Sequence, residues 1–295
     1  MIRKTLLILS MLVCSFSLSS EESEGLPLFC WRELPFENFG DFISWKLVER
    51  IVDQPVRAIR KKRVLEKKLL AIGSIFYFAT DGDVIWGSGI NGKTLLKEQY
   101  GFSKLDVRAV RGPRSRQFLM ENFHINCPEV YGDPALLFPY FFPEFKRKEN
   151  PQYEYIVIPH FSEIIQFPKD GTGKIVYPIE PWNEVVEKIL DSKFVISSSL
   201  HGVIVAEAYG IPARYLRVSE GESLFKYQDY YEGTNRPNFQ YARSVEEALS
   251  MGGEPQIVCD LSKLYQAFPF EFWPNADFKP LNLISIADLA KGCRP

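Results

Sequence analysis

The sequence has few of the residues that bind transition metals. It holds only three histidines and five cysteines among 295 residues, and no two cysteines form a CxxC pair. No compact group of carboxylates stands out either, so neither a zinc site nor a site for a harder cation is expected. The cysteines beyond residue 20 are scattered, and their even number permits two disulfides without requiring them. They are Cys30, Cys127, Cys259 and Cys293.

An excess of one charge is also lacking. The 35 Lys and Arg residues nearly balance the 37 Asp and Glu residues, giving a formal net charge of −2. The field of the whole protein would not attract nucleic acid, so any anionic ligand must be held by a local cluster. One basic run, Arg57–Lys68, would suit a membrane surface or an anionic glycan. Such a run is more often a solvated helix face, and we place it outside the site.

The N-terminal apolar run is too short for a typical membrane span, which needs about 18 or more residues. It covers Thr5–Leu18, follows Arg3-Lys4 and precedes Ser19-Ser20. This order is typical of a secretory signal peptide. Residues 1–20 are therefore expected to be a signal peptide, or a signal anchor that associates with a membrane. The protein is then expected in a secretory lumen, in a periplasm or anchored to a membrane, rather than in the cytoplasm.

Apolar and aromatic residues are plentiful. They make up 46% of the chain, with 23 Phe and 14 Tyr, which predicts sizeable cores or aromatic-lined clefts. Short apolar runs alternate with amphipathic stretches, the pattern of βαβ units in an α/β fold with a parallel sheet. Strands are expected at 28–31, 68–72, 84–86, 107–110, 153–158, 194–197 and 214–216. Helices are expected at 41–52, 113–122, 181–190, 200–209, 244–249, 260–267 and 285–291.

Prolines divide the chain into two series of such units. The stretch from Pro134 to Pro151 includes a charged run at 146–149 and is interpreted as an interdomain linker. It would join two Rossmann-like domains, at 26–145 and 151–270, followed by a C-terminal tail at 271–295. No internal repeat of fixed period is visible.

The element from Val195 to Pro212 carries the sharpest chemical signal. An apolar strand ends in three serines, turns at His201-Gly202 and enters a helix. In a doubly wound sheet, ligands bind beyond the carboxyl ends of strands, where helix N-termini suit phosphate or carboxylate groups. Histidine is the natural proton carrier there, so His201 is expected to donate or shuttle a proton. The plainer alternative is a serine N-cap beside a satisfied core histidine. Glu207 would face either the same cleft or the solvent.

Other residues fit the same kind of site. Arg111 and Arg114 stand between a strand and a helix, where guanidinium groups can hold an anion in a bidentate manner. Arg111 could equally cap a helix or pair with Asp106. Asp41 follows a glycine turn and is either a cleft carboxylate or an N-cap. His160 follows a strand, whereas His124 lies in a loop and is expected to be ordinary.

Taken together, these elements resemble the polysaccharide pyruvyl transferase family, over residues 36 to about 250. Their order and spacing make the resemblance specific, although no single element would. They are Asn38-Phe-Gly-Asp41, Ile72-Gly-Ser74, Asp83–Gly89, Val110-Arg-Gly-Pro113 with Ser115, Gly132-Asp-Pro-Ala-Leu-Leu137, Ile158-Pro-His160, Ser199-Leu-His-Gly202 continuing to Pro212, and Phe225-Lys-Tyr-Gln-Asp-Tyr230.

The resemblance implies a GT-B-like pair of Rossmann domains, with phosphoenolpyruvate in the cleft between them and a sugar or polysaccharide as acceptor. It assigns catalysis to His201 and Asp41, and substrate binding to Arg111, Leu200 and the neighbouring residues. The other residues expected to bind substrate are Arg114, Ser199, His160, Glu207 and Lys226. No cofactor is implied.

The chain departs from the family at one position. Many members have arginine before Leu-His, where this chain has Ser199. One guanidinium for the donor is therefore missing, and the basic groups that would compensate are Arg114, Arg214, Arg217 and Lys226. The leader is a second departure, because bacterial members usually act in the cytosol and eukaryotic relatives in the secretory lumen.

Two other functions suit the same sequence features. The first is a GT-B glycosyltransferase that uses a nucleotide sugar, since fold does not define substrate. The second is a secreted glycan-binding protein that has lost catalysis, as the serine at position 199 would permit. Titration with phosphoenolpyruvate, nucleotide sugars and glycans separates these alternatives.

Overall fold

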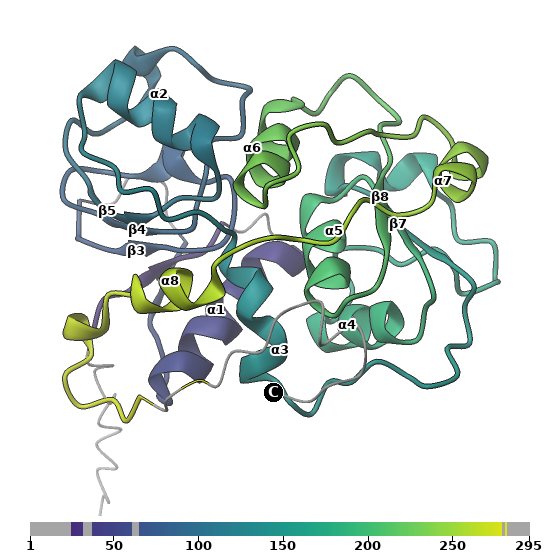
Figure 1. Ribbon diagram of the computed structural model, residues 1–295. Coiled ribbons are helices and arrows are strands. Elements are labelled where there is room, and N and C mark those ends of the chain that lie inside the picture. The colour runs from purple at the N-terminus through teal and green to yellow at the C-terminus, as the bar shows by residue number, and fades with distance from the viewer. Residues whose placement is uncertain (1–24, 32–36, 61–64, 279–280, 282–295) are drawn as a thin grey trace, which may run out of the picture.

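The computed structural model describes residues 25–31, 37–60, 65–278 and 281, and contains two parallel sheets (Figure 1). The first has the strand order β2-β1-β3-β4-β5 and the second β6-β7-β8. The α/β class with parallel sheets is therefore confirmed. The strands are β1 (Leu28–Phe29), β2 (Ala58–Ile59), β3 (Leu69–Leu70), β4 (Val84–Trp86), β5 (Asp106–Ala109), β6 (Ile156–Ile158), β7 (Val195–Ser197) and β8 (Ala213–Tyr215).

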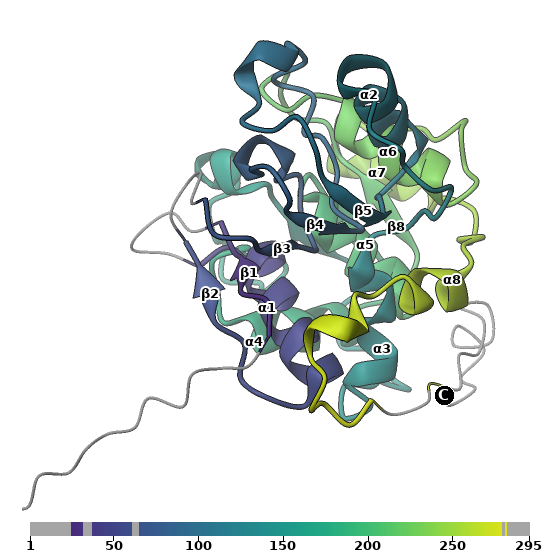
Figure 2. The same ribbon diagram turned by 90° about the vertical axis from the view of Figure 1, so that its left-hand side faces the viewer.

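Helices pack on both sheets and connect the two halves. Helix α1 contacts α3, α4 and α5, while α6, which follows the second sheet, packs against α2 of the first half (Figures 1 and 2). The helices are α1 (Phe39–Val52), α2 (Pro113–Phe123), α3 (Phe138–Phe141), α4 (Trp182–Leu190), α5 (Leu200–Ala208), α6 (Phe225–Gly233), α7 (Val245–Met251) and α8 (Leu261–Gln266). Short 3-10 helices are η1 (Phe76–Phe78), η2 (Lys97–Gln99), η3 (Pro134–Leu137), η4 (Phe161–Gln166) and η5 (Phe270–Phe272).

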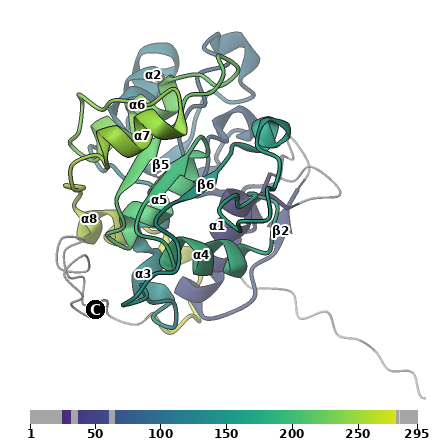
Figure 3. The ribbon, with the colours of Figure 1, turned by 90° about the vertical axis from the view of Figure 1, so that its right-hand side faces the viewer.

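The second sheet is covered on both faces, as parallel sheets are (Figure 3). Ile156 and Val195 belong to the main core with α4 and α5, whereas Val157 and Ile196 form a separate cluster with α7. Successive strand residues point to opposite faces, so these apolar runs bury every position. Helix α5 is buried along nearly its whole length, which explains why its sequence is apolar all round.

Most of the predicted elements are confirmed within a few residues. Helix α6 was missed because Phe225–Gly233 has a weak helical pattern, with aromatic and polar residues on all sides. Strand β2 was missed because it lies within the basic run. The helix expected at 285–291 and the leader lie outside the described residues. Within the described ranges, no helix is both long and apolar enough to cross a membrane.

The linker prediction was wrong for the first part of Pro134–Pro151. Residues 134–142 form η3 and α3 and are buried against α1 and α5. Their sequence explains this, because Ala135–Phe138 is wholly apolar and the Asp133 side chain caps η3 by accepting from the Ala135 amide at 3.0 Å. Only the part from about residue 143 onward is mainly exposed.

The basic run is not a uniformly solvated helix face. Lys68 is fully buried, and its Nζ lies 2.6 Å from Asp83 Oδ2 and 3.0 Å from Thr80 Oγ1. A buried ammonium group is stable only with such partners. Ala58 and Ile59 within the run form strand β2, so this part is not helical, whereas Arg57, Arg60 and Lys67 are exposed as expected. Residues 61–64 lie outside the described residues.

The end of the described chain returns to the first sheet. Trp86 Nε1 in β4 donates a hydrogen bond to the Leu264 carbonyl at 2.8 Å, and the Trp86 ring meets Phe268 edge-on. Helix α8, which the sequence places in the second domain, therefore packs on the first half. The domain boundaries at 145 and 151 stay a prediction.

Candidate active site

A cavity of about 280 Å³ lies at the carboxyl ends of strands from both sheets. This is where α/β proteins place their ligands. One wall comes from segments that follow β1, β3 and β4, and the other from segments that follow β6, β7 and β8. The lining residues include Trp31, Asn38, Asp41, Gly73, Ser74, Asn91, Lys93, His160, Ser199, Leu200, His201, Glu222 and Lys226.

His201 stands at the N-terminus of α5, directly after the end of β7. Its ring lies against Gly40 of α1, where a built Cβ would come within 2.0 Å of the imidazole Nδ1. Only glycine leaves room for the ring at position 40. The first turn of α1 is held in place by Asn38, whose Oδ1 accepts from the Gly40 amide at 2.9 Å. The glycine and the cap therefore place the histidine at the junction of the two sheets.

The plainer interpretation of the His201 element is right only about the position of Ser199. Ser199 is at the N-cap of α5, but its side chain makes no capping hydrogen bond. His201 Nε2 is buried without a hydrogen-bond partner among the described residues, so the ring is not a satisfied core histidine. A buried polar atom left unpaired costs free energy, and such atoms often mark functional sites.

Two acidic groups near His201 have strongly perturbed protonation. Burial raises the pKa of Asp41 to about 8, although the Trp31 backbone opposes the change with a hydrogen bond. Burial raises the pKa of Asp133 to about 7 against the opposing effects of the Ala135 amide and the Arg111 guanidinium. Asp41 is not the N-cap of α1, since Asn38 takes that place. Asp41 is thus mainly a neutral carboxylic acid near pH 7.

The pKa of His201 is shifted in the opposite direction, below its ordinary value. Burial, together with the positive charges of Arg111 and Lys226 and the neighbouring His160, lowers the pKa of His201 to about 3. The imidazole is therefore neutral at pH 7. A neutral acid at Asp41 and a neutral base at His201 then line the same cavity. Groups whose environments separate their pKa values in this way are suited to paired acid and base roles.

Arg111 lies beneath the cavity rather than on its wall. Its side chain is fully buried, and its guanidinium donates to Asp229 Oδ2 at 3.1 Å, Ser74 Oγ at 2.6 Å and the Ile90 carbonyl at 2.6 Å. It pairs with Asp229 and not with Asp106, which binds Arg108. Ser74 does line the cavity, so Arg111 supports the wall through that hydroxyl.

Two further residues expected in the site lie outside the cavity. The Glu207 carboxylate faces neither the cleft nor the solvent, because it accepts from Arg236 Nη1 and from the Tyr230 hydroxyl, each at 2.6 Å. Arg114 donates to Glu232, with its Nη2 at 2.7 Å from Oε1. His124 is the exposed C-cap of α2, as its loop position indicated.

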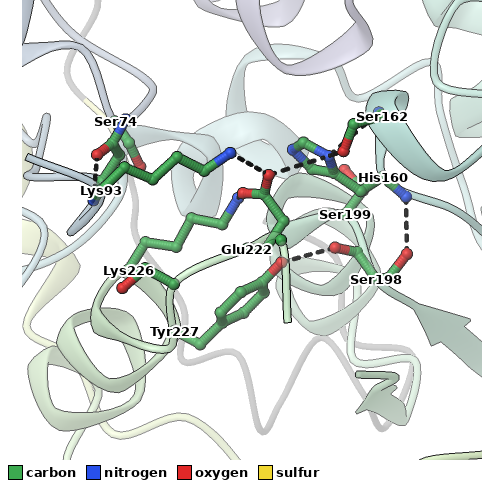
Figure 4. A network of polar contacts seen from close by, with 12 residues as sticks. Ser74, Lys93, His160, Ser162, Ser198, Ser199, Glu222, Lys226 and Tyr227 are labelled. Carbon is green, nitrogen blue, oxygen red and sulfur yellow. Dashed lines mark hydrogen bonds and ion pairs between the residues drawn. The ribbon is translucent and has the colours of Figure 1, made fainter. Parts of the chain in front are cut away.

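The remaining expected residues line the cavity together with residues that the sequence did not single out. Lys226 contacts Glu222, which also binds Lys93 and lies 3.6 Å from His160 Nδ1 (Figure 4). No motif pointed to Lys93 or Glu222, since each stands alone in an irregular segment. Asp133 was visible as the acidic residue of the Gly132-Asp-Pro-Ala element.

No group of three or more His, Cys, Asp or Glu suited to a metal ion occurs in the ranges that the structure describes. Cys30, Cys127 and Cys259 are free thiols. Cys293 lies outside the described residues.

The fold and the cavity define a parallel-sheet α/β protein with a ligand site shared by two sheets. The sequence pattern of the polysaccharide pyruvyl transferase family matches residues 38–220. The chain therefore belongs to this family of transferases, whose members act in pyruvyl transfer to polysaccharide.

The chain is similar to curated proteins and to solved structures, of which three examples follow. The uncharacterized protein L143 of Acanthamoeba polyphaga mimivirus is 27% identical over 229 residues, covering 72% of this chain and 78% of that protein. The succinoglycan biosynthesis protein ExoV of Rhizobium meliloti (strain 1021) is 27% identical over 178 residues, covering 57% of this chain and 54% of ExoV. The crystal structure of a functionally uncharacterized protein from Klebsiella pneumoniae aligns with a TM-score of 0.42 and 11% identity, over 74% of this chain and 93% of that one.

Proposed function

We propose that this chain transfers the pyruvyl group of phosphoenolpyruvate to hydroxyls of a sugar or polysaccharide, forming a ketal. The observation that carries the proposal is the pairing of a neutral acid, Asp41, with a neutral base, His201, in one cavity that also presents lysine ammonium groups. Membership of the pyruvyl transferase family supports the reaction class, and the succinoglycan relative supports a polysaccharide acceptor.

The reaction needs one proton at carbon and two deprotonated hydroxyls. The methylene carbon of the donor gains a proton, and the neighbouring carbon forms two bonds to sugar oxygens. The bond from that carbon to the phosphate oxygen breaks. Two hydroxyl protons are lost, one proton is gained at the methylene, and one leaves with the phosphate, so the step balances.

Asp41 is the group that can donate to the methylene carbon, because its raised pKa keeps it protonated near pH 7. His201 is the group that can take a proton from the sugar hydroxyl, because its lowered pKa keeps it unprotonated. A bound anionic donor would raise the pKa of His201, which helps it to accept that proton. Proton transfer is thus assigned to two residues of the chain, and no step requires a cofactor.

The fold offers a place for the negative charge that moves to the leaving phosphate. Ser74 is held by Arg111, and α5 presents its N-terminus beside Ser199 and Leu200 at the cavity wall. Helix N-termini and fixed hydroxyl groups stabilise developing anions. The proposal includes a GT-B-like arrangement, in which the two sheets belong to two Rossmann-like domains and the cavity lies in the cleft between them.

The experiment that tests the function is an acceptor-dependent phosphate-release assay. Purified protein is incubated with phosphoenolpyruvate and a panel of sugars and polysaccharides. Release of phosphate only when both substrates are present is the expected result. Turnover of nucleotide sugars without turnover of phosphoenolpyruvate would instead indicate a glycosyltransferase, and glycan binding without any turnover would indicate a binding protein.

A further inference from the structure

Three charged residues form a bridge across the cavity. Lys93 follows β4 of the first sheet, whereas Glu222 and Lys226 follow β8 of the second. One oxygen of the Glu222 carboxylate lies 2.5 Å from Lys93 Nζ, and its other oxygen contacts Lys226 Nζ (Figure 4). The two ammonium groups come from opposite walls and share one carboxylate.

Burial makes this bridge costly unless every charge has a partner. The side chains of Lys226 and Glu222 are only 8% and 5% exposed, and only Lys93 reaches solvent, at 48%. Burial lowers the pKa of Lys226, and the neighbouring Glu222 opposes that shift. Unpaired charges in such a place cost several kcal/mol, so an anion must stand between the lysines. In the structure that anion is the Glu222 carboxylate.

The same position suits an incoming anion. Glu222 accepts from two ammonium groups, and two such charged donors on one anion are a set that suits a phosphate group. Of the basic residues that could replace the guanidinium missing at Ser199, only Lys226 lines the cavity. Arg114, Arg214 and Arg217 are paired with Glu232, Glu254 and Glu220 outside it.

We propose that Lys93 and Lys226 form the subsite for the donor's phosphate, and that Glu222 is a resident counter-ion which the phosphate displaces. The subsite rests on the proposed function and names how this chain holds its donor without an arginine at position 199. Two lysines and one glutamate carry a net charge of +1, and removal of the carboxylate from between them leaves two positive charges for a phosphate dianion. Displacement of Glu222 also frees Lys93 from the opposite wall. Donor binding therefore replaces the Lys93–Glu222 ion pair between the two walls with contacts from both lysines to the phosphate.

The test measures the affinity of the full-length protein for inorganic phosphate and for phosphoenolpyruvate by isothermal titration calorimetry at fixed ionic strength. Lys93→Met and Lys226→Met should each weaken phosphate binding by about tenfold or more, the usual scale for a lost charge-assisted hydrogen bond. Glu222→Gln should strengthen it several-fold, because the competing carboxylate is gone. Lys97→Met, at an exposed lysine outside the cavity, is the matched control and should leave the affinity unchanged.

The lysine variants and Glu222→Gln should change phosphate affinity in opposite directions, and this distinguishes a binding role from a structural one. If the bridge only holds the fold together, Glu222→Gln weakens phosphate binding along with the lysine variants, and the proposal is overturned. Lys226→Met removes one of the two cations that pair with the buried Glu222 carboxylate, so the double variant Lys226→Met/Glu222→Gln keeps the test valid if the single variant does not fold. The double variant should bind phosphate more weakly than Glu222→Gln alone, and equal affinity of the two would also overturn the proposal. Restoring the family residue with Ser199→Arg should recover binding in the Lys226→Met background.

Phosphate affinity is measured without acceptor or turnover, so the subsite and the proposed function can fail separately. The expected affinities without any pyruvyl transfer would support the subsite and contradict the function. Pyruvyl transfer with lysine variants that bind phosphate like the wild-type protein would support the function and overturn the subsite.

Discussion

The Nε2 atom of His201 and the Oδ2 atom of Asp133 lie 3.8 Å apart, both buried, and neither has a hydrogen-bond partner among the described residues. The separation is too long for a hydrogen bond between the two atoms. No other polar group of the described residues bonds to either atom. The opposite side of the ring rests on Gly40. The imidazole is therefore positioned by packing on one side and faces a carboxyl group on the other, and a small shift of the ring would join the two.

Replacing His201 with alanine should lower the rate of acceptor-dependent phosphate release by about 10²–10⁴-fold, the usual effect of losing a general acid–base group. The fold should be retained, because the ring makes no hydrogen bond that the helix needs. His124→Asn, at an exposed helix cap that tolerates a left-handed backbone, is the matched control. A folded His201→Ala protein that keeps more than about a tenth of the rate would remove the assignment.

Asp41→Asn should abolish most activity and also change how stability depends on pH. The folded pKa of Asp41, about 8, lies above its ordinary value of 3.8, so its protonated form is favoured by folding. The contribution of Asp41 to the free energy of unfolding is fully present below about pH 4 and is lost as the pH rises toward and through 8. Chemical unfolding should show that the free energy of unfolding declines less between pH 5 and 9 for Asp41→Asn than for the wild type. Equal declines would show that Asp41 ionises normally.

Gly40→Ala should impair catalysis through His201. The added Cβ would meet the imidazole at 2.0 Å, so either the ring or α1 must move. A displacement of about 1 Å can cost roughly 10²-fold in rate. Gly221→Ala, where the nearest atom to an added Cβ is 3.4 Å away, is the control. Rates are compared in the phosphate-release assay, and an unchanged rate for Gly40→Ala would mean that the position of the ring is unimportant.

Arg111→Lys should reduce stability as well as activity. The sequence predicted that Arg111 binds substrate, but the guanidinium is buried and holds Asp229, Ser74 and a backbone carbonyl at once. A lysine cannot reproduce that fork, and a damaged buried pair costs about 3–5 kcal/mol. Urea unfolding gives the free energy directly. A loss of donor affinity with full stability would instead place the guanidinium in contact with the donor.

Residues 1–20 should be removed or inserted in a membrane in the native host. A positive end, a short apolar run and a small-residue exit are recognised for translocation. N-terminal sequencing of the mature protein should give a start near Glu21 if the segment is cleaved. An intact Met1 on soluble cytosolic protein would contradict this localisation.

The sequence predicted the elements of the fold better than the contacts of the site. Hydrophobic periodicity and strand-end motifs are local, so they located β7, α5 and His201. The partners of charged side chains are set by tertiary packing. Glu207 shows this, because its partner Arg236 is 29 residues away and no local pattern joins them.

The same limit explains the residues that were missed. Lys93 and Glu222 are 129 residues apart and meet only because two sheets place their strand ends at one cavity. The buried segment 134–142 was interpreted as a linker because its prolines suggested a loop, whereas its apolar residues pack between α1 and α5. Proline at the start of a short helix is compatible with helical structure, and η3 begins in this way.

The most direct test of the proposed reaction is the fate of the donor's methylene group in deuterated water. The protein is incubated in D₂O with phosphoenolpyruvate and an acceptor that supports phosphate release, and the modified sugar is examined by NMR. Protonation of the methylene carbon by an exchangeable carboxyl group predicts a ketal whose methyl group carries one deuterium. A product that keeps the methylene group, or a ketal methyl without deuterium, would contradict the account.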